Sequence, residues 1–352
     1  MNNHLVILAG GLGERFWPLS NQKCPKQFRD ILNCGRTLLQ MTFDHFAGMF
    51  DPKNIWVVTN KAFLSYVKEQ LPEILDERIL CEPISRNTAP SIAYVSWKIK
   101  SIDARANVVV TPSDHFITNL KAFQESIHRC MDFTAETDSI AMIGIRPTTP
   151  EIGYGYIEAD LSFASSRHPS IYRVDHFIEK PSIEVAQNYL KSKGTFWNSG
   201  IFIWNVSTIV NAYRIYQPIM ANFFESILPY YGTEKETQII EEHFGECENI
   251  SVDYAIMEKV EEIFVYSSNF GWRDLGSWKS LYEELDKDAH ENACVGNINL
   301  FETNHCLIHT SSLKKVVVQG LEKCIVSENE GVLLICKMTE EQRIKLFHDK
   351  DE

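Results

Sequence analysis

Basic side chains gather in one short segment of an otherwise acidic chain. The formal net charge of the 352 residues is −13. Residues 14 to 29 nevertheless carry four basic residues against one acidic residue, namely Arg15, Lys23, Lys26 and Arg29 against Glu14. Such a local patch can attract a small anion, whereas the overall negative charge excludes broad binding to nucleic acid or to anionic membranes.

A glycine cluster precedes this basic patch. Gly10, Gly11 and Gly13 follow the apolar run at residues 5–8. Glycine permits positive φ and lets backbone N–H groups approach an anion closely, so the segment is a candidate nest for a triphosphate. It completes no dinucleotide fingerprint, because Phe16 stands at the last glycine position, and no Walker A loop, which needs Lys and then Ser or Thr. A tight strand-to-helix turn remains the alternative.

Two prolines predict that the basic patch stays a loop. Pro18 and Pro25 interrupt helix formation between Arg15 and Lys26. We therefore expect these two cations to lie on a loop that can fold over bound phosphates.

The surrounding elements predict how this loop is positioned. Short runs rich in β-branched residues alternate with segments in which apolar residues recur every three or four positions. This alternation predicts an α/β fold with a Rossmann-like mixed, mainly parallel sheet that helices cover on both faces. The expected strands lie at residues 5–8, 55–59, 108–111 and 140–145, and the expected helices at 38–50, 62–71, 91–102 and 122–133. Ligands of such sheets bind at the carboxyl ends of the strands, where the glycine cluster falls.

The chain changes character towards its C-terminus. From about residue 150 strand-like pieces mix with helices expected at residues 206–216 and 253–260, and we interpret them as a continuation of the same domain. The last sixty or so residues are instead typical of short strands separated by turns, followed by a charged helical end. We therefore predict a main domain over residues 1–290 and a small β-rich tail over residues 291–352.

Composition favours a cytoplasmic protein. No apolar run approaches the length that spans a membrane, and the N-terminus lacks the pattern of a secretion signal. The nine cysteines are odd in number and form no C-x-x-C pair, which is typical of reduced thiols in the cytosol. We expect a protein that binds neither membranes nor nucleic acid.

Seven further motifs follow the segment LAGGLGERFWPLS…PKQF along the chain. They are EPISRNTAP, TPSDHFI, GYGYIE, FIEKP, WNSGIFIW, SVDYAIMEK and WRDLGSW, at residues 82–90, 111–117, 153–158, 177–181, 197–204, 251–259 and 272–278. In this order they resemble the motifs of the sugar-1-phosphate nucleotidyltransferases, from residue 5 to about residue 285. The first segment is similar in form to the mannose-1-phosphate guanylyltransferase branch of that family. The resemblance implies the nucleotidyltransferase fold.

The resemblance implies attack by a sugar-1-phosphate oxygen on the α-phosphorus of a nucleoside triphosphate, with pyrophosphate leaving. For this branch the substrates are GTP and α-D-mannose 1-phosphate, and the product is GDP-mannose. Such transfers depend mostly on positioning and electrostatic stabilisation, without a protein nucleophile. Arg15 and Lys26 would be catalytic cations that stabilise charge on the leaving pyrophosphate.

The resemblance implies a divalent cation held by Asp114 and Asp274, which also count as catalytic residues. Mg²⁺ usually takes one or two protein carboxylates together with phosphate oxygens and water. Asp114 follows a predicted strand, at the crevice end of the sheet. From the residues alone, a turn or a helix cap is an equal alternative for Asp114.

By the same resemblance, one group of residues contacts the sugar phosphate. Glu179 would accept hydrogen bonds from sugar hydroxyls, and the catalytic Lys180 would hold the phosphate that attacks. Gly155 would offer backbone groups to the hexose, and Asn198 its side-chain amide.

Base recognition is expected in the first half of the chain. Guanine presents a ring N–H and an exocyclic amine that adenine lacks at those positions, and a carboxylate can accept from both. Glu82, after the apolar run at residues 79–81, is the candidate reader, with Asn87 and Thr88 for base or ribose contacts. An ion pair between Glu82 and Arg86 is the alternative.

Other functions stay open at this point. A different hexose or heptose 1-phosphate could be the acceptor, and a non-catalytic regulatory subunit could share the fold. The sixty or so residues after the Asp274 region are too few for the C-terminal isomerase domain of some relatives, so we expect a single activity. The tail is similar to the short β-helix-like end of single-activity members, which implies a packing or homodimer surface.

Overall fold

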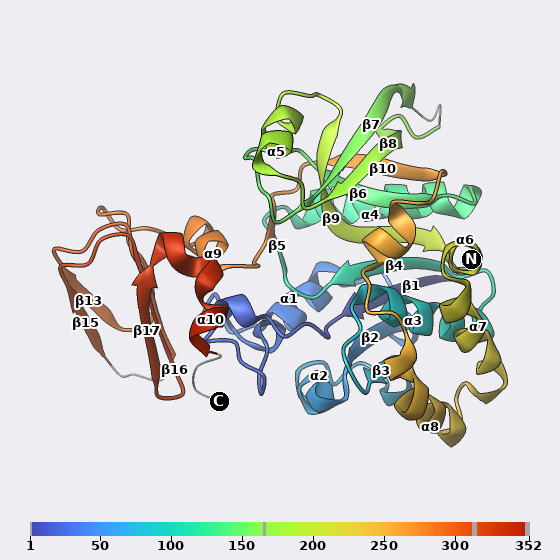
Figure 1. Ribbon diagram of the computed structural model, residues 1–352, viewed down its shortest axis with the longest axis horizontal. Helices are drawn as coiled ribbons and strands as arrows, with labels where there is room; N and C mark the ends of the chain where they lie inside the picture. The colour runs from blue at the N-terminus through green and yellow to red at the C-terminus, as the bar shows by residue number, and fades with distance from the viewer. Residues whose placement is uncertain (1, 165–166, 312–314, 349–352) are drawn as a thin grey trace. The chain divides into compact units, whose positions relative to one another are not determined.

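Within residues 2–164, 167–311 and 315–348, which the computed structural model describes, a nine-stranded sheet forms the centre of one of two units (Figure 1). Unit 1 consists of Met1–Gly10, Phe43–Pro112 and Ile117–Trp272. Unit 2 consists of Gly11–Thr42, Ser113–Phe116 and Arg273–Glu352. Each unit therefore combines segments that lie far apart in the sequence.

The large sheet contains all four strands that the apolar runs predict. Its strands are β1 (Asn3–Leu8), β2 (Ile55–Asn60), β3 (Ile79–Glu82), β4 (Asn107–Pro112), β6 (Ile140–Ile145), β7 (Gly155–Ala164), β8 (Ile171–Glu179), β9 (Thr195–Asn205) and β10 (Ile263–Ser268). They follow the order β3-β2-β1-β4-β9-β6-β10-β8-β7. The central strand β1 is buried on both faces, as its continuous apolar run predicts for a parallel sheet covered by helices.

The expectation of a mainly parallel sheet is wrong for one half of it. Strands β3, β2, β1 and β4 are parallel, and so are β6 and β10. Strand β9 instead runs antiparallel to β4, β6 and β7, and β8 runs antiparallel to β7 and β10. The connection from β7 to β8 shows the physical reason, since residues 165–170 are fewer than the dozen or so that a parallel crossover needs.

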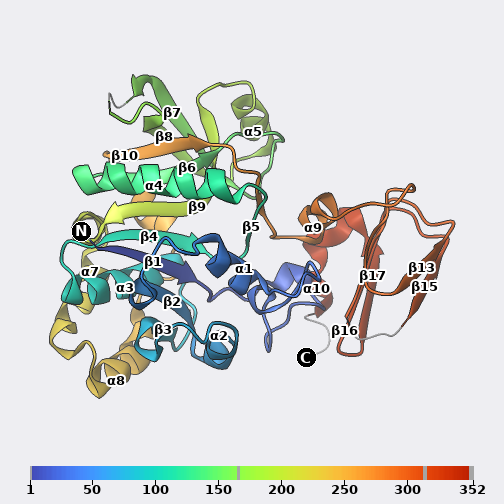
Figure 2. The ribbon, with the colours of Figure 1, turned by 180° about the vertical axis from the view of Figure 1, so that it is seen from behind.

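Helices cover both faces of this sheet. On one face, α3 (Thr88–Ile102), α6 (Val206–Tyr216) and α7 (Pro218–Ser226) share an apolar cluster with the side chains that β1, β2 and β4 direct towards them. On the opposite face lies α4 (Leu120–Glu136), which Figure 2 shows in front of the strands. Asn119 caps α4 by accepting a hydrogen bond from the Ala122 N–H at 3.1 Å.

The helices α1 (Leu38–His45) and α2 (Leu64–Gln70) match expected segments with some shifts. No expected helix covers α5 (Ile183–Tyr189) or α8 (Glu234–His243). α1 ends five residues before the expected Phe50, because the chain tightens into i→i−3 turns and Gly48 takes a φ of 76°. The helix expected at residues 253–260 is a single π-helical turn, Asp253–Met257.

Unit 2 contains the β-rich C-terminal region that the sequence predicts. Strands β12 (Ala293–Val295), β14 (Leu307–Thr310), β16 (Cys324–Asn329) and β17 (Val332–Lys337) form one sheet, and β13 (Ile298–Phe301) pairs with β15 (Val316–Gln319). β12, β14 and β16 are parallel, as are β13 and β15. The helices of this region are α9 (Trp278–Glu284) and the short α10 (Lys345–His348). A domain boundary at residue 290 and a homodimer surface stay predictions.

Two findings concern the class of protein. Across the described part of the chain, no helix is long and apolar enough to cross a membrane. None of the nine cysteines, all of which lie in the described residues, takes part in a disulfide bond.

Candidate functional site

Lys26 and Asp114 form the centre of the predicted phosphate and metal site in unit 2. Their Nζ and Oδ2 atoms lie 2.8 Å apart, and both side chains are largely buried. Lys26 also donates to the Leu275 carbonyl oxygen at 2.7 Å. Burial opposes ionisation of Asp114, but the positive charge of Lys26 and the proximity of His115 outweigh it and lower the pKa of this carboxyl. Asp114 is therefore held as a carboxylate beside a cation.

Asp274 lies in the same part of unit 2. It ends β11 (Trp272–Asp274), which pairs with β5 (His115–Ile117), the strand directly after Asp114. Burial lowers the pKa of His115. The negative charges of Asp114 and Asp274 act in the opposite direction but do not outweigh burial. Gly276 leaves room for the second carboxylate, since a Cβ at this position would lie 2.7 Å from Asp274 Oδ2. Unit 2 thus brings together the two predicted metal ligands and one predicted cation.

The glycine cluster lies in a loop, and the segment from Arg15 to Lys26 forms neither α-helix nor strand, as the two prolines predict. Gly13 takes a φ of 66°, and a Cβ there would lie 2.8 Å from Lys26 Cγ and 2.9 Å from Ser20 Oγ. Position 13 therefore requires glycine both for its backbone and for the close approach of Lys26. The Gly11 carbonyl oxygen accepts a hydrogen bond from Gln27 at 2.8 Å. Gly11 belongs to unit 2 and Gly10 to unit 1.

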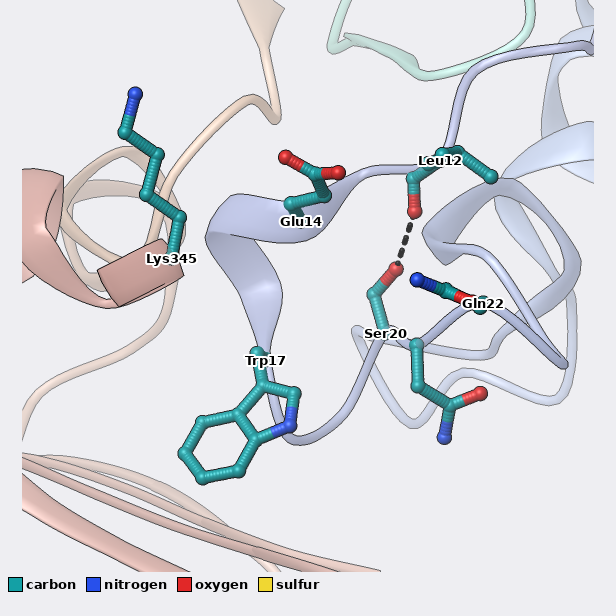
Figure 3. Close-up of a pocket in the computed structure, with 7 residues that line it drawn as sticks. Leu12, Glu14, Trp17, Ser20, Gln22 and Lys345 are labelled. Carbon is teal, nitrogen blue, oxygen red and sulfur yellow. Dashed lines mark hydrogen bonds between the residues drawn. The ribbon is translucent and has the colours of Figure 1, made fainter. Parts of the chain in front are cut away.

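A small pocket lies beside this loop (Figure 3). It has a volume of about 160 Å³ and is lined by Leu12, Glu14, Trp17, Ser20, Asn21, Gln22 and Lys345. Small-molecule sites usually measure about 300–1,000 Å³, so this pocket alone does not hold a nucleotide. Arg15, in the 3₁₀ turn Glu14–Phe16, is exposed and makes no hydrogen bond or ion pair with any residue that the structure describes.

Glu82 ends β3 in unit 1 and is buried, with 3% of its surface exposed. Its Oε1 has no hydrogen-bond partner among the described residues. Oε2 would lie 3.5 Å from a Cβ at Gly10. Burial raises the pKa of Glu82 to about 7, and a hydrogen bond from Ser91 opposes the rise. The alternative ion pair is absent from the described residues, because Arg86 donates to the Gly245 carbonyl oxygen instead.

Asn87 and Thr88 begin α3 and have structural partners. Asn87 has a φ of 64°, and its Oδ1 accepts from the Thr88 N–H at 2.9 Å as the cap of the helix. Thr88 Oγ1 accepts from the Val252 N–H at 2.9 Å. Contacts of these two side chains with a base or ribose stay predictions.

The predicted sugar-site residues meet in unit 1. Gly155 of β7 lies opposite Glu179 of β8, and a Cβ at 155 would collide with Glu179 Oε2 and lie 3.3 Å from Asn198 Cβ. Lys180 follows β8 with a φ of 48° and bonds Glu179 Oε1 through Nζ at 2.7 Å. The four residues are therefore neighbours, with a cation beside one carboxylate.

Sequence reasoning missed a second carboxylate in this group. Asp253 Oδ1 accepts from Asn198 Nδ2 at 2.9 Å, and Asn198 Oδ1 accepts from the Gly200 N–H at 2.9 Å. Burial, and then the charge of Glu179, raise the pKa of Asp253 to about 6. The signal was an acidic residue inside the SVDYAIMEK motif. The direction of the Asp253 side chain depends on the π-helical turn, which no sequence periodicity predicts.

No cluster of three or more His, Cys, Asp or Glu side chains with metal-binding geometry occurs in the described residues. The structure instead offers a pair of aspartates in unit 2, beside His115 and Lys26.

Comparison with known proteins gives consistent results. The family model described as nucleotidyl transferase matches residues 4–291. The mannose-1-phosphate guanylyltransferase 2 of Escherichia coli O157:H7 is 33% identical over 348 residues, which cover 97% of this chain and 71% of that protein. The alginate biosynthesis protein AlgA of Pseudomonas fluorescens is 34% identical over 345 residues, covering 97% and 70%. A crystal structure described as mannose-1-phosphate geranyltransferase from Thermus thermophilus has a TM-score of 0.86 at 28% identity, over 99% of each chain.

The raised pKa of Glu82 predicts a pH-dependent stability. The unfolded carboxyl ionises near its ordinary value of 4.5, but the folded one only near 7, so the unfolded chain binds fewer protons in this range and stability falls as pH rises. Above pH 7 the loss reaches about 3 kcal/mol. Glu82→Gln cannot ionise, so its Tm relative to the unsubstituted protein should increase between pH 4.5 and pH 8.

Thermal unfolding of both proteins without nucleotide, in a series of buffers over this range, checks the expectation. A Tm difference that is the same at every pH would show that Glu82 does not carry the shift.

Proposed function

Because the chain belongs to the nucleotidyl transferase family, and within it to the mannose-1-phosphate guanylyltransferases, we propose that it transfers GMP from GTP to α-D-mannose 1-phosphate. The observation that supports the choice of substrates is the likeness, over 97% of this chain, to enzymes of that name. The geometry of both units supports the same reaction.

The chemistry is a single displacement at phosphorus. An oxygen of the sugar phosphate forms a bond to the α-phosphorus of GTP, and the bond from that phosphorus to the oxygen that bridges the α- and β-phosphates breaks. GDP-mannose forms, and pyrophosphate leaves with the bonding electron pair. The protein needs no covalent intermediate, so its residues act by binding, orienting and stabilising charge.

In unit 2, Lys26 and Arg15 bind the triphosphate. Lys26 is positioned by Asp114 and by the Leu275 carbonyl oxygen, so its ammonium is already oriented before a substrate arrives. A preorganised cation stabilises the developing negative charge of the leaving pyrophosphate without further reorganisation. The N–H groups of Gly11 and Gly13 add neutral donors to the phosphates.

Nucleotidyl transferases generally use a divalent metal ion, and Asp114 with Asp274 fits Mg²⁺. The lowered pKa of Asp114 keeps this ligand ionised, and the space at Gly276 accommodates the Asp274 carboxylate. Both supply the hard oxygen donors that Mg²⁺ prefers. When bound, the ion neutralises negative charge on the phosphates.

In unit 1, Glu179 and Asp253 bind the sugar hydroxyls as acceptors, and Lys180 holds the attacking phosphate. Asn198 is oriented by Asp253 and by the Gly200 N–H, which leaves its second amide hydrogen for the hexose. Gly155 keeps the space beside Glu179 open for this contact.

Glu82 reads the guanine, with Asn87 and Thr88 beside the base or ribose. Its buried Oε1 has no partner among the described residues, and an unpaired buried acceptor gains free energy from two donors of the base. Because the ionised carboxylate is the better acceptor, binding of guanine lowers the pKa of Glu82 from its raised value.

The reaction and its metal dependence can be tested in one assay. Pyrophosphate release is measured with four nucleoside triphosphates against several sugar 1-phosphates, with and without Mg²⁺. We expect release with GTP and mannose 1-phosphate, loss with EDTA and recovery with Mg²⁺. Release only with another sugar 1-phosphate would change the acceptor, no release in any combination would indicate a non-catalytic subunit, and full activity without a divalent ion would remove the metal role.

Substitution of Lys26 should reduce the rate strongly, and it should also lower the stability, because it leaves the largely buried Asp114 carboxylate without its cation. Losing one preorganised donor to a developing charge costs on the order of 3 kcal/mol, so Lys26→Ala should lower kcat roughly a hundredfold. Lys23→Ala is the matched control, because Lys23 is exposed in the same loop and should change kcat little. Steady-state kinetics and Tm are measured for both. A folded Lys26→Ala protein with near-normal kcat would remove Lys26 from the site.

Glu82→Gln should reduce the preference for GTP. The amide presents an N–H where the base also donates, so the ratio of kcat/KM for GTP to that for ATP should fall by at least about tenfold. Glu14→Gln, which removes an exposed carboxylate of the glycine loop, is the control and should leave the ratio unchanged. If Glu82→Gln retains the full ratio, another residue reads the base.

A further inference from the structure

The turn between β16 and β17, at residues 329–332, holds the basic loop of unit 2, by which we mean residues 12 to 31. Asn329, at the end of β16, is buried and donates from Nδ2 to the Pro18 carbonyl oxygen at 3.0 Å. Its Oδ1 accepts from the Arg29 guanidinium at 3.5 Å and from the Ser311 hydroxyl at 2.9 Å. Both the nitrogen and the oxygen of the Asn329 carboxamide therefore make hydrogen bonds. Two of its three partners are loop residues, one on each side of Lys26.

Arg29 extends this attachment. Its Nη2 lies 2.8 Å from Glu330 Oε1 in the β16–β17 turn, and its Nε donates to the Cys24 carbonyl oxygen at 3.5 Å. A guanidinium is a rigid planar fork, so bonds from one Arg to several groups fix their relative positions. The segment that contains Lys26 is thus held to the turn at its C-terminal end by Arg29 and at its N-terminal end by Pro18.

Other residues of the C-terminal region reinforce the same attachment. Trp278 Nε1 donates to the Trp17 carbonyl oxygen at 3.4 Å, and His309 Nε2 lies 3.2 Å from the Ile31 carbonyl oxygen. One apolar cluster also joins loop and C-terminal strands, and its members include Phe16, Leu19, Ile31, Trp278, Leu307 and Ile325.

The C-terminal helix reaches the loop as well. Lys345 of α10 lines the small pocket together with Glu14 and Trp17, as Figure 3 shows. Across the pocket, the Ser20 hydroxyl donates to the Leu12 carbonyl oxygen at 3.0 Å and closes the loop on itself. The described contacts of residues 12 to 31 thus include residues from α9, β14, the β16–β17 turn and α10.

We propose that the β16–β17 turn is part of the catalytic machinery, with Asn329 as a positioning residue that holds the triphosphate-binding loop in its working shape through Pro18 and Arg29. The inference rests on the proposed function for the identity of the ligand, GTP. It gives the β-rich C-terminal region a role in the transfer reaction, because Lys26 and Arg15 lie on the loop that the turn holds.

A second buried asparagine separates positioning from stability. Asn292 is as buried as Asn329 and lies in the same β-rich region. Its Nδ2 donates to the Thr303 carbonyl oxygen at 2.8 Å, and its Oδ1 accepts from the Cys306 N–H at 3.0 Å. These bonds stay within residues 288–306, so Asn292→Ala removes a comparable buried network without touching the loop.

The experiment compares Asn329→Ala, Asn329→Asp and Asn292→Ala with the unsubstituted enzyme. Asn329→Asp keeps the side-chain volume and the acceptor for Arg29 but loses the donor to Pro18, so it tests the proposal even if the alanine variant folds poorly. Both Asn329 variants should raise KM for GTP at least about fivefold and leave KM for mannose 1-phosphate within about twofold. Asn292→Ala should lower Tm by about as much as Asn329→Ala does, and it should leave KM for GTP unchanged.

Hydrogen–deuterium exchange of residues 14–32, measured without substrates, provides a readout that does not depend on activity. Exchange of this segment should increase in the Asn329 variants and not in Asn292→Ala. Unchanged exchange and unchanged KM for GTP in the Asn329 variants, or an equal rise of KM in Asn292→Ala, would overturn the proposal. An unsubstituted enzyme that releases no pyrophosphate would refute the proposed function, while the exchange comparison would still decide whether the turn holds the loop.

Discussion

One ammonium group joins the three chain segments of which unit 2 consists. Lys26 belongs to the segment Gly11–Thr42, its salt-bridge partner Asp114 to Ser113–Phe116, and its carbonyl partner Leu275 to the segment that begins at Arg273. A largely buried ion pair adds little net stability, because desolvation offsets the Coulomb attraction. Its value here is geometric, since the pair sets the place of a cation and a carboxylate that the proposed function brings to phosphate.

Three carboxyl groups near the predicted site residues have pKa values that are shifted in opposite directions. Asp114 lies beside a cation, and its pKa is lowered. Burial raises the pKa of Glu82 to about 7, and burial with the charge of Glu179 raises that of Asp253 to about 6. A carboxylate with a low pKa suits a metal ion, whereas carboxyl groups with raised pKa values gain most from neutral donors such as hydroxyl and guanine N–H groups. The proposed assignment of phosphate and metal to unit 2, and of sugar and base to unit 1, agrees with these shifts.

The sequence predicts those parts of the molecule that depend on local patterns. Strands β1, β2, β4 and β6 are continuous apolar runs, and the loop between Arg15 and Lys26 follows from its prolines. Contacts made across long stretches of chain leave no such pattern. The three-residue strands β5 and β11, which bring Asp274 beside His115, are too short for any periodicity, and the direction of Asp253 depends on one π-helical turn. The expected parallel sheet failed where β9 enters antiparallel, since alternation of strands and helices does not fix strand direction.

Glycines near the predicted site leave space for charged side chains. Gly155 was expected to offer its backbone to the sugar, yet its closest neighbour is the Glu179 carboxylate, which a Cβ would displace. Gly276 stands in the same relation to Asp274, and Gly13 to the stem of Lys26. The atoms displaced at 155 and 276 are the ends of flexible side chains, so an added methyl group would move the Glu179 or Asp274 carboxylate before it disturbed the core. Glycine at these positions therefore governs the placement of charged groups. In the sequence, each of these glycines stands inside a motif, and nothing there indicates which side chain needs the space.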